Sequence, residues 1–538
     1  MLSYRKLAMR VLGRPLHTGG GIDSPRPASQ RAAAFILTAA MLTTLAAPAF
    51  AGTWYIENGD ITVKASDTGN NVTQNNNTTY GDTNTIITGT SDTNTVTIDT
   101  SKGNVDVTFD DLNIDASSRN EAAMSVTGSG NTTIKLDGDN HLTGGNGRSG
   151  IDSIGNLTIY GGENDSLTAK GGSGADGSGG DGIHSGSLTI YGGTVNANGG
   201  NCGDGNYSDG GSGIRISSRS LTIYDGKVNA KGGNGGDGNY SAGGNGISSS
   251  GSITISGGTV DAKGGNSGNG NYSAGGNGID NGGRSGSITI SGGTVDAKGG
   301  NSGTGDYSNG GSGICNGGRS GSITISGGTV NAAGGNDGNG NYSYGGSGIH
   351  SVSGSIDLSG SLELTAKAGS SNGKALSQNG KELDLDTIKD KLGPGAKVTA
   401  TDANGDSKQV SVPRPVEPEK PVIPEESSSS SDGGSAAPSA PVSSLPGLTV
   451  TDKSGAVISY TSTQSGNTLT VCVGRLTASL HVSLAALRQL RAEGIETITF
   501  QTILCSTTLS VDELLAMGGE DAEAVLTHRL TDSSLTVG

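Results

Sequence analysis

Hydrophobic and polar positions alternate in short runs that recur along the central part of the chain. In the run GSITISGGTVDAKGG, Ile253 and Ile255 alternate with serine and threonine, and Val260 and Ala262 alternate with polar residues. Alternation with a period of two predicts short β-strands that bury one face. We expect a third strand in each repeat, at an isoleucine that follows a glycine pair. These isoleucines are Ile183, Ile214, Ile247, Ile279, Ile314 and Ile349.

The threonine of each ITI or LTI triplet marks the length of the repeat. Successive threonines are 31, 33, 32, 35 and 35 residues apart, at Thr158, Thr189, Thr222, Thr254, Thr289 and Thr324. Three strands and glycine-rich corners within such a period are typical of one coil of a solenoid, whose stacked coils share a core that no coil forms alone. The sequence therefore predicts an all-β, right-handed parallel β-helix with coils of about 31–35 residues.

Composition and pattern divide the chain into five parts. Residues 1–51 combine basic residues, an apolar run and a small-residue cleavage site, which predicts a signal peptide and export from the cell. Residues 52–155 are expected to form irregular N-terminal coils, and residues 156–410 the regular glycine-rich coils with a C-terminal cap. Residues 411–446, rich in proline and serine, predict a linker. Residues 447–538 predict a small α+β domain.

In this C-terminal domain we expect a helix with Ser483 as its N-cap, residues 484–493 as its body and Gly494 as its C-cap. A second short helix is expected over residues 511–517. Strands are predicted in LTVTDKSG, TLTVCVG, ETITFQTIL, AVLTHRL and SLTV. Cys472 and Cys505 lie in strand-like runs, and the sequence leaves open whether they form a disulfide.

Composition and charge limit where the protein is expected to act and which partners it is expected to bind. Only 31% of the residues are hydrophobic and 3% aromatic, so the core must be thin, and the 98 glycines lack the every-third-residue period of collagen. The net charge of −16 disfavours nucleic acid and anionic membranes as partners. No apolar stretch after residue 51 is long enough to span a bilayer. We therefore expect a secreted or cell-surface protein.

Several of these segments are similar to a known type of protein. The motifs are ITISGGTVDAKGG with GGNGI, DVTFDDLNIDASS followed by TTIKLDGDNHLTGG, and the detached domain with AALRQLRAEGIETITF. The chain thereby resembles secreted right-handed β-helix proteins of gut-type Gram-positive bacteria, described as carbohydrate-binding-domain proteins. The resemblance implies a pectate-lyase-like solenoid and a role in binding polysaccharide.

Two columns of tyrosines are the candidate binding residues. In a parallel solenoid, a recurring residue forms a column with a spacing of about 4.8 Å, and phenol rings offer faces and hydroxyls that suit pyranose rings. The alternative is that the tyrosines stack on each other and hold the glycine-rich loops together. The first column is Tyr160, Tyr191 and Tyr224, and the second is Tyr207, Tyr240, Tyr272, Tyr307 and Tyr342.

Polar residues also recur in register. The asparagines after the glycine pair are expected to form a structural hydrogen-bonding ladder; they are Asn201, Asn234, Asn266, Asn301 and Asn336. No cofactor is required by these patterns, but calcium is left open. Asp176 and Asp237 match the core of a calcium-binding nonapeptide, while Asp261 and Asp296 belong to neighbouring coils. Pairing of these last two with Lys263 and Lys298 is the simpler interpretation.

Three classes of function are compatible with this organisation. The first is a non-catalytic module that binds polysaccharide or a cell-envelope glycan through outward columns of tyrosines and of serine and threonine hydroxyls. The second is a structural stalk or adhesin that presents the C-terminal domain to a protein partner. The third is a polysaccharide lyase or hydrolase, which is disfavoured because glutamate is nearly absent from the coils and because His184 and His350 occupy a variable position of the repeat.

Overall fold

A computed structural model describes residues 51–175, 177–414, 447–451, 457–458, 460–473, 477–502, 505–517, 523–529 and 532–537. The predicted signal peptide, apart from its last residue, and most of the predicted linker lie outside these ranges. The chain forms a parallel β-solenoid of about 13 turns, which confirms the predicted fold, and a small C-terminal sheet domain. We describe each part by itself.

Three parallel sheets run along the solenoid, and we name them by sequence. The GI sheet contains β15 (Ile214–Ile216), β18 (Ile247–Ser249), β21 (Ile279–Asn281), β24 (Ile314–Asn316), β27 (Ile349–Ser351) and β30 (Leu376–Gln378). The ITI sheet contains β16 (Leu221–Ile223), β19 (Ile253–Ile255), β22 (Ile288–Ile290), β25 (Ile323–Ile325) and β28 (Ile356–Leu358). The TVDA sheet contains β14 (Thr194–Asn198), β17 (Lys227–Lys231), β20 (Thr259–Lys263), β23 (Thr294–Lys298), β26 (Thr329–Ala333), β29 (Glu363–Lys367) and β32 (Lys397–Thr401).

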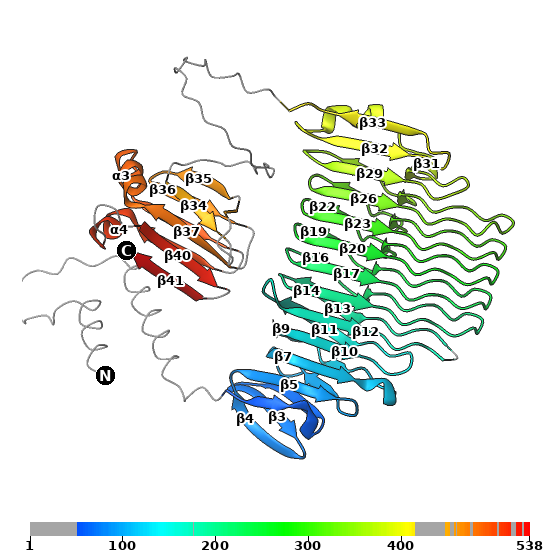
Figure 1. Ribbon diagram of the computed structural model, residues 1–538, viewed down its shortest axis with the longest axis horizontal. Helices are drawn as coiled ribbons and strands as arrows, with labels where there is room; N and C mark the ends of the chain where they lie inside the picture. The colour runs from blue at the N-terminus through cyan, green and yellow to red at the C-terminus, as the bar shows by residue number, and fades with distance from the viewer. Residues whose placement is uncertain are drawn as a thin grey trace, which may run out of the picture. The chain divides into compact units, whose positions relative to one another are not determined.

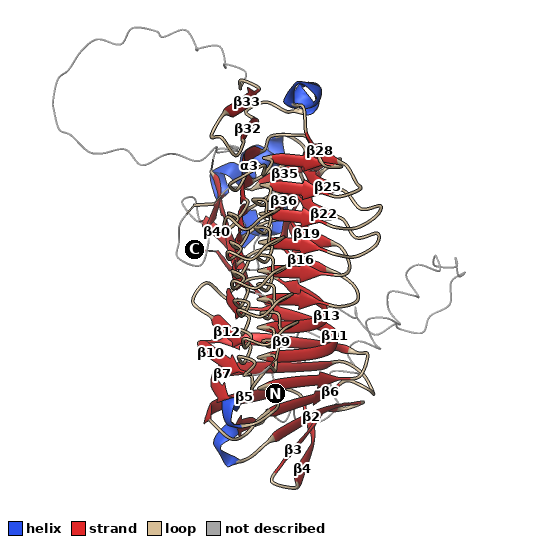
Figure 2. Ribbon diagram, turned by 90° about the vertical axis from the view of Figure 1, so that its right-hand side faces the viewer, coloured by secondary structure: helices blue, strands red, loops and turns tan. Residues whose placement is uncertain are grey.

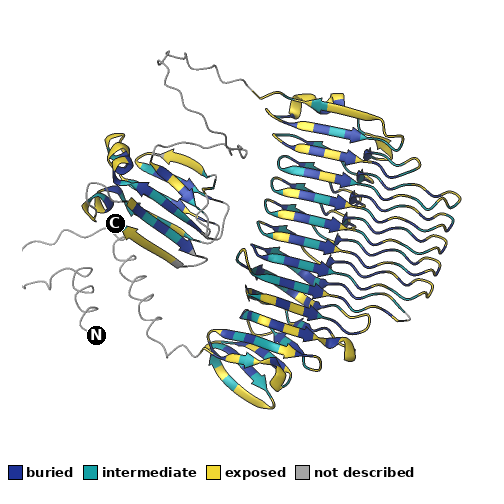
Figure 3. Ribbon diagram, in the orientation of Figure 1, coloured by how far each residue is buried: buried dark blue, intermediate teal, exposed yellow. Residues whose placement is uncertain are grey.

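The register between coils is the one that the repeat predicts. Thr254 pairs with Thr222 in the preceding coil and with Thr289 in the following one. Figure 2 shows these strands stacked one above the other. The inward residues of one coil, Ile253, Ile255, Val260, Ala262 and Ile279, are all fully buried, and buried positions alternate with more exposed ones along the strands in Figure 3.

The early coils continue the same three sheets with longer strands. In β11 (Ile151–Tyr160) and β13 (Ile183–Ile190), one strand spans both the GI and the ITI sheet. The preceding strands are β1 (Thr53–Tyr55), β5 (Thr85–Ser91), β6 (Val96–Asp99), β7 (Val105–Asp115), β8 (Met124–Thr127), β9 (Asn131–Asp137), β10 (Asp139–Thr143) and, between β11 and β13, β12 (Ser166–Lys170). The irregular coils expected here are therefore part of the solenoid.

Antiparallel strands close both ends of the stack; the sequence predicted a cap at the C-terminal end but not these antiparallel pairings. At the N-terminal end, β2 (Ile61–Ser66), β3 (Gly69–Gln74) and β4 (Asn77–Asp82) form a meander. At the C-terminal end, β33 (Ser407–Ser411) pairs antiparallel with β32, next to a 3-10 helix at Leu385–Lys391. Such strands interrupt the parallel pattern and so prevent a further coil from being added.

The C-terminal domain consists of two four-stranded sheets and two short helices. One sheet has the order β34 (Leu448–Thr451), β37 (Thr477–Ser483), β40 (Glu523–Arg529), β41 (Asp532–Val537). The other has the order β35 (Thr461–Ser465), β36 (Thr468–Cys472), β38 (Thr497–Gln501), β39 (Ser506–Ser510). The helices are α3 (Leu484–Ala492) and α4 (Val511–Met517). Ser483 caps α3 as predicted, but the C-cap is Glu493 rather than Gly494.

The long glycine-rich loops project from one side of the strands and lie parallel to one another (Figure 1). In the coil of β20, the N–H of Gly276 on the returning arm donates to the carbonyl of Gly265 on the outgoing arm, at 2.8 Å. The N–H of Gly265 donates in turn to Gly244 of the preceding coil, also at 2.8 Å. The two arms therefore contact each other backbone to backbone, and a Cβ atom on Gly276 would lie 1.9 Å from the carbonyl oxygen of Gly244.

This packing predicts that Gly276→Ala destabilises the solenoid by about 2 kcal/mol or more, because the overlap is with backbone and forces the coils apart. Gly282→Ala is the matched control, since a Cβ there meets only the Asp280 side chain, at 3.7 Å. Urea denaturation followed by circular dichroism measures both variants. Equal midpoints for the two variants would contradict this account of the loops.

Candidate binding surface

The first tyrosine column lies on the outer side of the ITI sheet. Tyr160, Tyr191 and Tyr224 each follow the last inward isoleucine of their strand, so their side chains point away from the core. Their ring centroids are 4.7 and 4.9 Å apart, with interplanar angles of 5° and 8°. Tyr160 and Tyr191 are half-buried, and burial raises the pKa of both phenols. We call this column the ITI ladder.

The second column lies in the long loops, and we call it the loop ladder. Its members are Tyr207, Tyr240, Tyr272, Tyr307 and Tyr342, with centroids 4.9–5.0 Å apart and interplanar angles of 3–13°. All five are exposed. All five also have φ between 57° and 61°, a left-handed conformation that costs a residue with a side chain roughly 1–2 kcal/mol.

A buried serine after each tyrosine accompanies this unusual conformation. The Ser241 hydroxyl donates to the Gly205 carbonyl at 2.9 Å and accepts from the N–H of Ser208 at 3.2 Å. The same pattern recurs at Ser273 and Ser308. The left-handed turn thus places the tyrosine outward and the serine hydroxyl inward, where it satisfies backbone groups of adjacent coils. The repeated NYS and DYS triplets were the sequence signal for this arrangement, but their backbone conformation was not predicted.

Mutual stacking changes what the tyrosines offer to a ligand. A ring inside either ladder has a neighbouring ring on both faces, so its edge and hydroxyl are the accessible parts. The expected row of open ring faces is therefore not present along the ladders. The alternative interpretation, that the tyrosines stack on one another, describes the observed geometry, and open faces are confined to the ends of the two columns.

Beyond Tyr224 the ITI ladder passes into a regular array of hydroxyl groups. The same position of the next three coils is occupied by Ser256, Ser291 and Ser326. Together with the neighbouring columns, these residues form three rows of three hydroxyls, listed by coil as Ser252, Thr254 and Ser256; Ser287, Thr289 and Ser291; Ser322, Thr324 and Ser326. Their side chains are half-buried or exposed, and the three threonines pair in register in the ITI sheet.

The other predicted columns have structural roles. The Asn234 side-chain carbonyl accepts from the backbone N–H of Asn266 at 3.0 Å, and the ladder of such bonds from Asn201 to Asn336 is confirmed. Asp261 and Asp296 pair in register, and their carboxylates contact Lys263 and Lys298 at 2.7 and 2.9 Å. Charge pairing is therefore the observed arrangement for these two aspartates.

Of the calcium candidates, Asp261 and Asp296 are paired with lysines, and Asp237 contacts backbone. Asp237 accepts from the backbone N–H of Asn269 at 2.9 Å, and Asp176 lies outside the described residues. Within the described part of the chain, no three His, Cys, Asp or Glu side chains are grouped so that they could hold a metal ion.

The variable position after the GI isoleucine, which the repeat pattern identified, forms a column of titratable side chains whose interactions the sequence did not predict. His184 Nδ1 lies 2.9 Å from Asp152 Oδ1, and this hydrogen bond raises the pKa of His184 and lowers that of Asp152. Further along the column, Ser248 is followed by Asp280, Cys315 and His350 in successive coils. Burial lowers the pKa of His350. Burial and the adjacent Asp280 carboxylate raise the pKa of the Cys315 thiol far above its usual range, so this thiol is protonated and a poor nucleophile.

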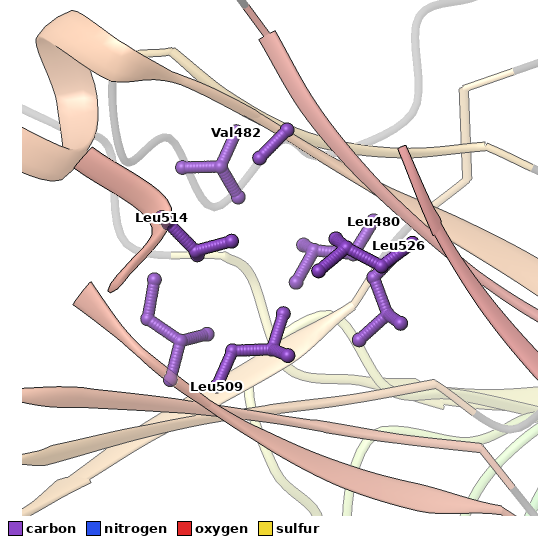
Figure 4. A pocket seen from close by; sticks show the side chains of 8 residues that line it. Leu480, Val482, Leu509, Leu514 and Leu526 are labelled. Carbon is purple, nitrogen blue, oxygen red and sulfur yellow. The ribbon is translucent and has the colours of Figure 1, made fainter. Parts of the chain in front are cut away.

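The C-terminal domain has a small apolar cavity between its two sheets and α4. Figure 4 shows side chains such as Leu480, Leu509, Leu514 and Leu526 pointing into it. These residues belong to the core of the domain, and no charged group faces the cavity among the lining residues. Cys472 and Cys505 are both free thiols, so the disulfide that the sequence left open is not formed.

Comparison of the chain with protein-family models, with curated proteins and with solved structures found no match. None of the helices among the described residues is long and apolar enough to cross a membrane.

The pKa values of the two histidines in the titratable column are predicted to be shifted in opposite directions from the ordinary value of about 6.5. His184 faces Asp152, Asp181 and Arg215, and its raised pKa means that its stabilising effect is present at low pH and is lost as pH rises through that pKa. His350 is buried beside Lys374, and the folded state is expected to lose stability as pH falls below about 6.5.

Histidine NMR titration, with His184→Gln and His350→Gln for assignment, measures both midpoints. Asp152→Asn should lower the midpoint of His184 and leave that of His350 unchanged. A His184 midpoint that does not respond to Asp152→Asn would refute the assigned cause.

Proposed function

We propose that the solenoid is a non-catalytic module that acts outside the cell and binds an extended, uncharged polysaccharide along the outer side of the ITI sheet. The basic and apolar pattern of residues 1–51 supports export. The net charge of −16 favours a neutral polymer over a polyanionic one, because like charges repel across the whole surface.

The feature that carries this proposal is the junction between the ITI ladder and the hydroxyl array. Tyr224 is the last ring of the ladder and the most exposed, at 40%. The next coil has Ser256 at this position, so the outer face of the Tyr224 ring is not covered by another ring. A pyranose ring stacked on that face would lie directly over the hydroxyl array, which is the combination of apolar face and polar partners that sugars require.

The rest of the glycan would follow the array from coil to coil. The hydroxyl columns recur at the coil spacing of about 4.8 Å, and neighbouring columns alternate along each strand. A single neutral hydrogen bond contributes only about 0.5–1.5 kcal/mol, so several must form together. The array sits on a hydrogen-bonded sheet and is ordered before the ligand arrives, which lowers the entropic cost of binding.

Sedimentation with insoluble neutral polysaccharides tests this site in the full chain. Tyr224→Ala should weaken binding by about tenfold, the equivalent of one aromatic stacking contact. Ser256→Leu should weaken it similarly, because a branched aliphatic side chain would cover the open face of Tyr224 without offering a flat ring of its own.

Tyr80→Ala is the matched control, since Tyr80 is 73% exposed but lies in the N-terminal meander. Unchanged binding in both Tyr224→Ala and Ser256→Leu would exclude this surface as the glycan site.

A further inference from the structure

The solenoid holds its coils together without covalent links between them in the described residues. The four cysteines, Cys202, Cys315, Cys472 and Cys505, are all free. The long loops depend on backbone hydrogen bonds between glycines, and they have few apolar side chains to bury. In repeat proteins of this kind each coil contacts only its neighbours, so opening can begin at one coil and spread to the next.

The loop ladder brings reactive phenol side chains together in these long loops, which are held mainly by backbone hydrogen bonds. Its five phenol rings lie in five successive coils and are nearly parallel. The centroids of neighbouring rings are no more than 5.0 Å apart. The rings at the two ends, Tyr207 and Tyr342, are 73% and 67% exposed, and the three inner rings are 46–49% exposed. A soluble oxidant can therefore reach every ring, and each ring has a partner of the same chemistry beside it.

We propose that the loop ladder is a site of oxidative tyrosine cross-linking, in which neighbouring coils become joined as dityrosine. This inference concerns a different column of residues from the proposed glycan site and does not depend on it. The co-reactant is a one-electron oxidising system, such as a heme peroxidase with hydrogen peroxide. Two neighbouring phenols each lose one electron and one proton and become phenoxyl radicals.

The two radicals then join through one new carbon–carbon bond between the ring carbons ortho to oxygen. The ring hydrogens at these carbons move through solvent to the phenol oxygens, which restores both hydroxyl groups. The net change in the protein is the loss of two hydrogen atoms per link, and one hydrogen peroxide is reduced to two water molecules.

The geometry favours links within one molecule. A radical on one ring already has the next ring in contact, whereas a ring on another molecule must arrive by diffusion, and a pre-positioned partner has a far higher effective concentration. Each link would also join the tips of two successive loops, so that the two coils could open only together. The ladder would then give the solenoid the covalent support that its free cysteines do not.

Peroxidase treatment of the full chain at low protein concentration tests the proposal. Every ring of the loop ladder lies in a different tryptic peptide, because basic residues separate the tyrosines; these are Arg219, Lys263, Lys298 and Arg319. Mass spectrometry of the digest should find peptides of neighbouring coils joined, each pair lighter by two hydrogen atoms. The undigested protein should gain dityrosine fluorescence and remain monomeric on a denaturing gel.

Tyr240→Phe with Tyr307→Phe keeps the stack of rings but separates the remaining phenols by phenylalanine, and joined peptides of the loop ladder should be lost. Tyr55→Phe with Tyr80→Phe removes two exposed phenols outside either ladder and should leave those joined peptides at their original yield. The proposal is overturned if the joined peptides persist in the first variant, or if the links connect different molecules in proportion to protein concentration.

Discussion

Each coil of the solenoid is hydrogen-bonded to the next through backbone groups in all three sheets, with each residue of the repeat opposite its own equivalent. Thr254 between Thr222 and Thr289 is one example of this register. Because the spacing between coils is about 4.8 Å, any residue type that recurs in the sequence becomes a column with contacts along its length. The core, the asparagine ladder, the tyrosine ladders and the hydroxyl array all follow from this one constraint.

The same constraint explains why so much of the chain is glycine. The arms of the long loops hydrogen-bond to each other and to the next coil, and atoms that a side chain would add collide with neighbouring carbonyls, as at Gly276. With side chains excluded from between the arms, apolar burial is concentrated in the strands. The loop tips are the exception, where the tyrosine and serine pairs supply both ring stacking and buried hydroxyls.

Departures from exact repetition are as informative as the repeats. One position on the GI sheet changes from coil to coil, and it collects Asp152, His184, Asp280, Cys315 and His350 in a single column. The hydrogen bond to Asp152 raises the pKa of His184, whereas burial lowers that of His350, so two histidines at the same place in the repeat respond in opposite ways. On the ITI sheet, the change from Tyr224 to Ser256 ends a ladder and leaves a ring face open.

The sequence alone determined the repeating coils of the solenoid, their strands and their register, because alternation with a period of two inside each repeat fixes which side chains of a strand face the core. It also determined which residues form columns, including both sets of tyrosines, and it favoured the pairing of Asp261 with Lys263 and of Asp296 with Lys298. The tertiary structure alone decided that the ring faces cover one another, that the loop tyrosines are left-handed, and that Cys472 and Cys505 stay apart. It also decided how the ends are capped. These features depend on the distance and orientation of groups in different coils or strands, which a pattern along one chain does not contain.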